Sequence, residues 1–332
     1  MIGILALIIT LVVFSIFTMK FPKGSKAMTG LANAAVASFF VEAVFKYILG
    51  DFANIEFFYQ LGTTCGELSG LASAILVGLY LKTNPVYALI IGLTCSPYGI
   101  LTGFIVGYLS HFILEKLEKH IPESIAIIFI SLLAAIIGSF FGSLIDPLVN
   151  NLISTVGVAI SQTTNTSPII MGFILGGLMK VTCTSPLSAM ALTAMLQLKG
   201  LPMGIAAIAC VGGAFADGVV LYYLKLGNKS NIIGIMLEPL TQANIVTKNP
   251  IPIYTSDFIA GGLSGIVAAS LGIINNAPGT SAPIPGLLAP FAFNDPLIVL
   301  LAIFFSAILG TISGILVSKI YIKIKKQDVI RN

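Results

Sequence analysis

Charged side chains are nearly absent from this 332-residue chain, and their scarcity decides which solvent it faces. Asp, Glu, Lys and Arg make up 9% of the residues, whereas hydrophobic residues make up 57%. Soluble domains carry roughly 25% charged residues, so this composition cannot supply a water-exposed surface. Most of the surface must therefore face lipid. We expect one integral membrane domain over residues 1–332, with N-terminal spans and an interfacial helix in 1–123 and the C-terminal spans and hairpins, which carry the candidate binding groups discussed below, in 124–332.

Apolar stretches long enough to cross a bilayer recur along the chain. A transmembrane helix needs about 20 predominantly apolar residues. Nine stretches approach or exceed this length: 2–19, 27–49, 61–81, 86–110, 124–149, 168–195, 201–225, 258–275 and 297–319. The polar connections between them, of which 151–167 is one of the longest, are too short to form a second core. The sequence thus predicts an all-α polytopic membrane protein with about nine transmembrane helices.

The basic residues predict the orientation of these helices. Cytoplasmic loops of membrane proteins carry an excess of Lys and Arg. If the N-terminus is outside, the cytoplasmic side receives Lys20, Lys23, Lys26, Lys82, Lys225, Lys229, Lys248, Lys319, Lys323, Lys325, Lys326 and Arg331. Only Lys116, Lys119 and Lys199 then fall outside. The basic tail, Lys319 to Arg331, predicts a cytoplasmic C-terminus.

Residues 111–123 are amphipathic, unlike the predicted spans. Apolar residues recur there at helical spacing, while glutamates and lysines occupy the other face. This pattern is typical of an amphipathic helix that lies in the membrane interface. His111 and His120 both belong to this segment, so we expect both histidines at the surface.

Proline and small polar residues interrupt several apolar stretches. Thr94-Cys95-Ser96-Pro97 and Thr182-Cys183-Thr184-Ser185-Pro186 each predict a broken helix, because proline removes a backbone donor. Segments 230–257 and 275–296 stay apolar between repeated Pro and Gly residues. In lipid, non-helical backbone is tolerated only where it is buried in protein or lines a cavity. We therefore expect two re-entrant, hairpin-like segments.

Acidic residues inside apolar surroundings are the candidate binding groups, because an intramembrane carboxylate usually marks a site or a pathway. Glu238, followed by Pro239, stands in a run without other charge. Glu67 opens a span, and Asp217 lies within one. Lys180, four residues before Thr184 in a broken span, could neutralise one of the acids or snorkel. Glu42 is expected to be structural, because it can form a helical ion pair with Lys46. Asp146 and Asp257 each lie near the end of a span, and we expect both at the membrane interface.

Several functional classes are disfavoured by the sequence. No nucleotide-binding loop, dinucleotide fingerprint or hydrolase motif occurs, so no self-contained catalytic group is expected. The four cysteines form no CxxC pair, which argues against a metal site. We expect no cofactor, and the absence of a basic patch with aromatics argues against nucleic acid as a partner.

The C-terminal third resembles the membrane subunit, enzyme IIC, of bacterial sugar phosphotransferase systems. Gly-Ile-Met-Leu-Glu-Pro at 234–239 is similar to that family's Gly-Ile-x-Glu-Pro motif, with one extra residue. Asn249-Pro250-Ile251, a Pro/Gly-rich segment at 277–289 and a final span follow in the family's order. The whole chain also looks like small stand-alone members of the group, which include perfringolysin-regulator-like proteins.

The resemblance implies a mechanism and partners. A sugar would bind near the bilayer midplane, with Glu238 and Pro239 at the site and Asn249 shaping the adjacent hairpin. A separate IIB-type protein, itself supplied by a IIA protein, would phosphorylate the sugar, and the membrane subunit would form a homodimer. Two alternatives stay open. Glu42, Asp217 and a weak internal repeat suit an ion-coupled transporter of another small solute, and a membrane sensor with a regulatory role is the third possibility.

Overall fold

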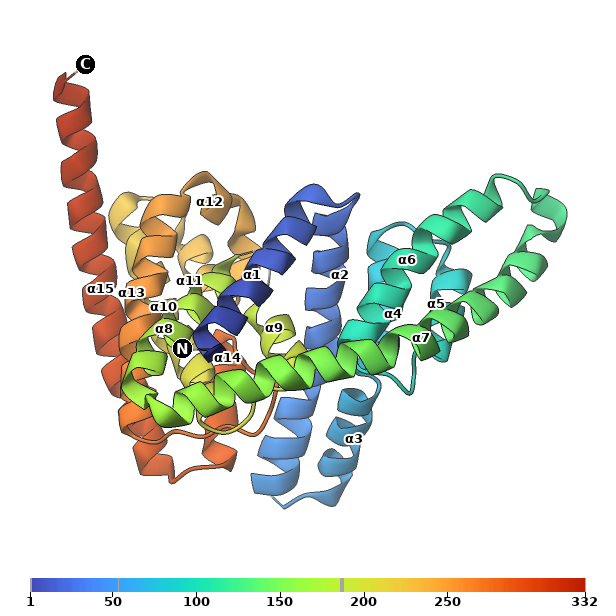
Figure 1. Cartoon of the computed structure of the whole chain (residues 1–332). Helices are drawn as coiled ribbons and strands as arrows, with labels where there is room; N and C mark the ends of the chain where they lie inside the picture. Colours follow the sequence, from blue (N-terminus) through green and yellow to red (C-terminus); the bar gives the residue numbers. More distant parts are fainter. Residues whose placement is uncertain (1, 53, 186–187, 332) are drawn as a thin grey trace. The chain divides into compact units, whose positions relative to one another are not determined.

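The computed structural model describes residues 2–52, 54–185 and 188–331, and every regular element in that part of the chain is a helix (Figure 1). Seven helices are long and apolar enough to cross a membrane: Ile2–Lys20, Gly24–Asp51, Ile100–Glu118, Ile125–Thr166, Leu201–Leu224, Pro250–Ser270 and Pro296–Ile324. The pair Glu56–Glu67 and Ser69–Tyr80, bent by 54°, makes an eighth if it counts as one span. The prediction of an all-α polytopic membrane protein is confirmed.

One predicted span is shorter than expected. The stretch 168–195 divides into α8 (Pro168–Thr184) and the short α9 (Ala189–Met195). The predicted break therefore falls where Thr182, Thr184 and Ser185 stand, while Pro186 lies outside the described residues.

Contacts along the chain divide it into two compact units. The first comprises Met1–Ala6, Ala159–Ala189 and Leu198–Asn332, and we refer to it as the C-terminal unit. The second comprises Leu7–Val158 and Met190–Gln197, and we refer to it as the N-terminal unit. Each is described below by itself.

In the N-terminal unit, α2 (Gly24–Ala35) continues through two π-helical segments, Val36–Phe40 and Ala43–Phe52. This continuation runs antiparallel to α3 (Glu56–Glu67), where Gly62 and Gly66 let the two backbones approach. The expected ion pair forms, with Lys46 Nζ 3.0 Å from Glu42 Oε1.

The predicted span 86–110 is a helical hairpin rather than one crossing. α5 (Pro85–Thr94) runs antiparallel to α4 (Ser69–Tyr80), and α6 (Ile100–Glu118) returns alongside α4 after a turn at the predicted Thr94–Pro97 break. The prediction of an interfacial helix over 111–123 is wrong, because α6 continues without interruption to Glu118. His111 consequently points into the unit and is 3% exposed, whereas His120 is exposed as expected.

This hairpin changes the predicted topology. Glu115 of α6 binds both Lys23, which precedes α2, and Lys119. Lys119 was expected on the opposite side of the membrane from Lys23, and that placement is wrong. Because α5 and α6 return the chain to the end from which it came, Lys23, Lys26, Lys82 and Lys119 gather at one end of the N-terminal unit.

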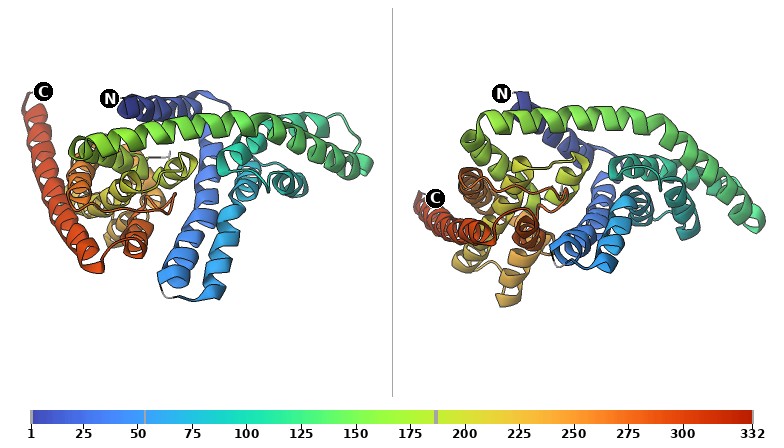
Figure 2. Two further views of the ribbon diagram at one scale, coloured as in Figure 1. Left: turned by 60° about the horizontal axis from the view of Figure 1, so that its bottom comes forward. Right: turned by 90° about the horizontal axis from the view of Figure 1, so that it is seen from below.

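The prediction that residues 151–167 form a polar connection is also wrong. α7 (Glu123–Thr166) is one 44-residue helix that contains Pro147 and continues through these residues, as the views in Figure 2 show. Its polar side chains bond locally. The hydroxyl groups of Ser154 and Thr155 both donate to the carbonyl of Asn151. Such bonds to the preceding turn satisfy a hydroxyl group without ending the helix.

The C-terminal unit is built around α10 (Leu201–Leu224), which is buried along nearly its whole length. α8, α13 (Pro250–Ser270) and α15 (Pro296–Arg331) pack against it (Figure 1). Small residues permit this close packing: Gly212 of α10 meets Gly310 of α15, and Gly176 of α8 meets Gly261 of α13. Helices that associate in lipid depend on such close backbone approach.

The two proposed hairpin segments lie at opposite ends of α10. The first contains α11 (Lys229–Leu237), a 3₁₀ turn (Pro239–Gln242) and α12 (Ala243–Lys248), which pack near the C-terminal end of α10. The second contains α14 (Pro283–Leu288) and a 3₁₀ turn (Ala289–Ala292) and packs along the N-terminal half of α10. α11 and α14 contact each other beside α10.

Candidate functional site

The middle turns of α10, residues 210–218, contact both hairpins and α8 of the C-terminal unit. Cys210 faces the second hairpin, Gly213 faces α8, Asp217 binds a lysine of α8, and Gly218 faces Met236 of α11. Side chains from both hairpins therefore converge on about two turns of one buried helix. This convergence defines the candidate site.

Three charged side chains lie at its centre, each with 0% exposure. The ammonium of Lys180 on α8 is 2.5 Å from Asp217 Oδ2 and 3.5 Å from Asp257 Oδ1 of α13. Thr184, one turn after Lys180, donates a hydrogen bond of 2.5 Å to Asp257 Oδ2. We call Lys180, Asp217 and Asp257 the buried triad.

The triad is costly to bury, because each ion loses its hydration and recovers it only through well-placed partners. With all three groups ionised it has a net charge of −1, which a single proton or monovalent cation would neutralise. In the part of the chain that the structure describes, Oδ1 of Asp217 has no hydrogen-bond partner. Charged groups inside membrane proteins are rare and usually functional.

Glycines make room for the triad. A methyl group added at Gly213 of α10 would collide with the side-chain carbons of Lys180. One added at Gly261 of α13 would meet Cβ of the same lysine. The lysine stem thus runs between two helices whose backbones leave no space for a larger residue, and this packing fixes the position of its ammonium group.

Glu238 stands at the break between α11 and the following 3₁₀ turn. Its backbone is extended, with φ −147° and ψ 95°, because Pro239 disfavours a helical residue before it. Its amide donates to the carbonyl of Gly234, and its own carbonyl accepts the hydroxyl of Thr241 at 2.7 Å. These bonds satisfy the backbone at the break without using the carboxyl group.

The side chain of Glu238 is half-buried and lies outside the spanning helices. Burial raises the pKa of its carboxyl group above the ordinary value, while the amide of Leu240 and the positive charge of Lys180 act in the opposite direction. The electrostatic influence of Lys180 connects Glu238 with the buried triad. The acid next to a proline thus lies beside, and not within, the buried triad.

The second hairpin reaches the same region from the other end. Ser281 donates to the carbonyl of Ala206 at 3.1 Å and lies 3.3 Å from the sulfur of Cys210. Asn294 closes the hairpin, because its side chain bonds both the amide and the carbonyl of Ile274. The chain therefore leaves and returns at one point, which is the shape expected for a re-entrant segment.

Four of the six predicted site residues come together, and two do not. Asp217 and Thr184 contact members of the triad, and Glu238 with Pro239 lies beside them. Asn249 is farther along the first hairpin, where its amide donates to the carbonyl of Ile245 and α13 begins after it. Glu67 is exposed at the end of α3 in the N-terminal unit.

The prediction that Asp257 is interfacial is wrong. The helix that carries it begins at Pro250, eight residues before the predicted span, so Asp257 is buried two turns inside it. Asn249-Pro250 was the available signal, because proline is favoured in the first turn of a helix. The expectation that Lys180 could neutralise an acid is confirmed by its contacts with both aspartates.

The fold and this site define a polytopic helical transport protein whose charged groups are enclosed by broken helices. Residues 25–331 match the family described as "Phosphotransferase system, EIIC", and the chain belongs to that family. It is thus a multi-pass bacterial membrane protein of a family of sugar-transporting permeases. No curated protein and no solved structure matches the chain.

Proposed function

We propose that this chain binds a sugar or similar polyol through the carboxyl group of Glu238 and moves it inward by alternating access. The observation that carries the proposal is the position of Glu238. It is half-buried at a helix break, beside the middle of α10 and within the electrostatic influence of Lys180. A carboxylate accepts hydrogen bonds from hydroxyl groups in several directions, as a polyol requires.

The two hairpins support the transport step. They approach α10 from opposite ends and contact each other, as would be needed to open the site to one side at a time. Broken helices that meet near the middle of the membrane are a recurrent feature of transporters. The family match covers both hairpins, α10 and α13.

The proposal includes a separate IIB-type protein as phosphate donor. The phosphoryl group would leave the cysteine sulfur of that protein and form a bond to a sugar hydroxyl oxygen, which releases its proton. A IIA-type protein would recharge the donor. We further propose a homodimer and a cytoplasmic C-terminus, the latter on the basis of the basic residues that follow Lys319.

Equilibrium binding of a panel of radiolabelled sugars and polyols tests the proposal. The full chain is purified and placed in lipid nanodiscs, and each ligand is measured against wild type and Glu238→Gln. The variant keeps size and removes the charge. We expect affinity to fall roughly 10- to 100-fold, because a hydrogen bond to a charged group contributes about 1.5–3 kcal/mol.

Glu56→Gln is the matched control, because Glu56 is exposed and bonds only its neighbour Gln60 among the described residues. It makes the same chemical change outside the site and should leave affinity unchanged. Equal binding by wild type and Glu238→Gln would remove Glu238 from the site. Failure of every sugar and polyol to bind wild type would refute the substrate class.

The buried triad favours a second candidate function, an ion-coupled transporter of another small solute. With all three groups ionised, the triad has a net charge of −1 on α8, α10 and α13, and ion coupling requires such a site to bind and release a cation. Uptake into proteoliposomes, without any phosphocarrier protein, separates the two functions. Uptake that follows an imposed proton or sodium gradient supports ion coupling, whereas uptake that requires a phosphorylated IIB protein supports the first proposal. Binding without flux under either condition would indicate a sensor.

A further inference from the structure

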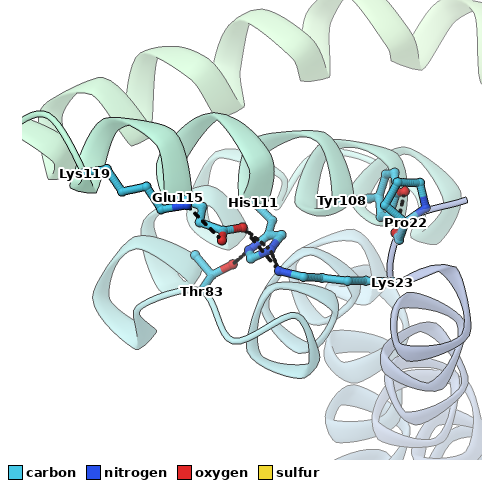
Figure 3. A network of polar contacts seen from close by, with 7 residues as sticks. All are labelled: Pro22, Lys23, Thr83, Tyr108, His111, Glu115 and Lys119. Carbon is cyan, nitrogen blue, oxygen red and sulfur yellow. Dashed lines mark hydrogen bonds and ion pairs between the residues drawn. The ribbon is translucent and has the colours of Figure 1, made fainter.

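A cavity of about 360 Å³ opens at the basic end of the N-terminal unit. It lies where α2 begins, where α4 ends and beside the last turns of α6 (Figure 3). Its polar lining is Lys23, Lys26, Lys82, Thr83, His111, Glu115 and Glu118. We call this the lysine cavity. It is unrelated to Glu238 and the buried triad, which belong to the other unit.

His111 organises one wall of the cavity. Lys23 Nζ lies 2.7 Å from Nε2 of the ring, and Thr83 Oγ1 lies 2.8 Å from Nδ1. An ammonium group only donates hydrogen bonds, so Nε2 must accept and Nδ1 must carry the hydrogen that Thr83 accepts. The ring is therefore neutral, and it holds Lys23 in place without cancelling its charge.

Positive charge is in excess around the cavity. Glu115 is shared between Lys23 at 3.2 Å and Lys119 at 3.5 Å. Lys26 and Lys82 make no ion pair within the described part of the chain, although both line the cavity. The three lysines of the lining against its two glutamates, Glu115 and Glu118, leave a net charge of +1. An anion would therefore be attracted to this end.

The start of α2 adds a backbone contribution. Lys23 precedes the helix in the left-handed conformation, with φ 55°, and no side chain from the described residues caps its first turn. The amide of Gly24 donates to the carbonyl of Phe21, but the dipole of a helix still favours a negative ligand near its N-terminus. Lys26 belongs to this same turn, and both Lys23 and Lys26 line the cavity.

We propose that the lysine cavity binds the phosphate group of an anionic ester. Lysines arranged as point charges around a helix N-terminus suit a tetrahedral oxyanion. Basic pockets between the ends of transmembrane helices also receive phospholipid headgroups. A lipid headgroup and a soluble phosphate ester share this chemistry, and the experiment distinguishes them. The proposal does not depend on sugar binding at Glu238.

The test uses the full chain in nanodiscs of phosphatidylcholine. In the lipid arm, phosphatidylglycerol is titrated and bound lipid is counted by native mass spectrometry. In the soluble arm, glycerol 3-phosphate and inorganic phosphate are titrated by calorimetry, with glycerol as the uncharged comparison. The variant Lys26→Gln/Lys82→Gln removes the two unpaired cations. We expect it to weaken binding of the phosphate ligand at least tenfold.

Lys229→Gln/Lys248→Gln is the matched control, because it removes the same charge from exposed lysines of the other unit. It should bind as wild type does, and Lys26→Arg/Lys82→Arg should retain binding. If phosphatidylglycerol binds and glycerol 3-phosphate does not displace it, the cavity is a lipid site. If glycerol 3-phosphate displaces the lipid, the cavity is a site for a soluble phosphate ester. The proposal is overturned if wild type prefers neither phosphatidylglycerol over phosphatidylcholine nor glycerol 3-phosphate and inorganic phosphate over glycerol. It is equally overturned if the two glutamine double variants lose binding alike.

Discussion

Both units pair lysine with carboxylates, but they do so in opposite surroundings. In the buried triad the side chains of Lys180 and its two aspartates have 0% exposure. In the lysine cavity the side chains of Lys23 and Glu115 are 37% and 42% exposed. Water screens the second pair and competes for its hydrogen bonds, so its contribution to stability is small. In the buried triad no water replaces a lost partner, and removal of Lys180 leaves both aspartates without a cation.

Replacement of Lys180 by Met should produce the largest effect on stability. The substitution keeps much of the side-chain volume between Gly213 and Gly261 but leaves two carboxylates buried without a cation. Breaking a buried ion pair costs about 3–5 kcal/mol. Thermal unfolding in detergent should show a large fall in Tm for Lys180→Met and no measurable change for Lys23→Met. Similar falls for both variants would show that burial does not distinguish the two sites.

The two aspartates of the triad should differ in importance. Asp217 lies 2.5 Å from the ammonium and Asp257 lies 3.5 Å from it. Asp217→Asn removes the closer charge and should cost about 3 kcal/mol, as expected for a broken buried pair. Asp257→Asn keeps the Lys180–Asp217 pair and an amide oxygen that can accept from Thr184. The free energy of unfolding should therefore fall by only about 1 kcal/mol, similar to the contribution of one hydrogen bond. Unfolding temperatures measured side by side check the order, which a reversed ranking would contradict.

Close packing around Lys180 predicts a smaller loss for Gly213→Ala. The added methyl group would collide with the lysine stem, and overpacking a filled interior costs about 1–3 kcal/mol. Gly99→Ala in the N-terminal unit is the control, because nothing lies within 4 Å of the added atom and its backbone is extended. Wild-type stability of both variants would mean that Lys180 can move aside at no cost.

Local sequence pattern predicted the helices and their breaks, because each depends on neighbouring residues. The interruptions at Thr94–Pro97 and Thr182–Pro186 follow from proline and from small polar residues that bond the freed backbone. The continuation of α7 was missed for a related reason: Asn150, Ser154 and Thr155 look polar in sequence, yet their side chains bond within the helix.

Long-range partners were beyond the reach of local pattern. Lys23 and His111 are 88 positions apart, and Lys180 is 37 positions from Asp217. The burial of His111 depends on the return of α6 alongside α4, which hydropathy alone does not distinguish from a further crossing. The Glu42–Lys46 pair was predicted because its members stand one helical turn apart.

Glu238 is less buried than the buried triad and more buried than Glu115 of the lysine cavity. The effect of its ionisation on the pH dependence of Tm should be the smallest of the predicted effects. Burial raises the pKa of its carboxyl group in the folded protein above the ordinary value of 4.5. The folded state therefore holds the proton more tightly than the unfolded state does. The stabilisation is present below the unfolded pKa and is lost as the pH rises through the folded pKa.

The measurement is the difference in Tm between wild type and Glu238→Gln as the pH is raised from 4. Glutamine does not titrate, so the Tm of wild type should fall relative to that of the variant as the pH rises. Glu56→Gln, which alters an exposed carboxylate, should show no such trend. The opposite slope, a gain of wild-type Tm with rising pH, would mean that Lys180 and the amide of Leu240 outweigh burial. Glu238 would then belong with the ion cluster instead of standing beside it as a free acceptor for a hydroxyl group.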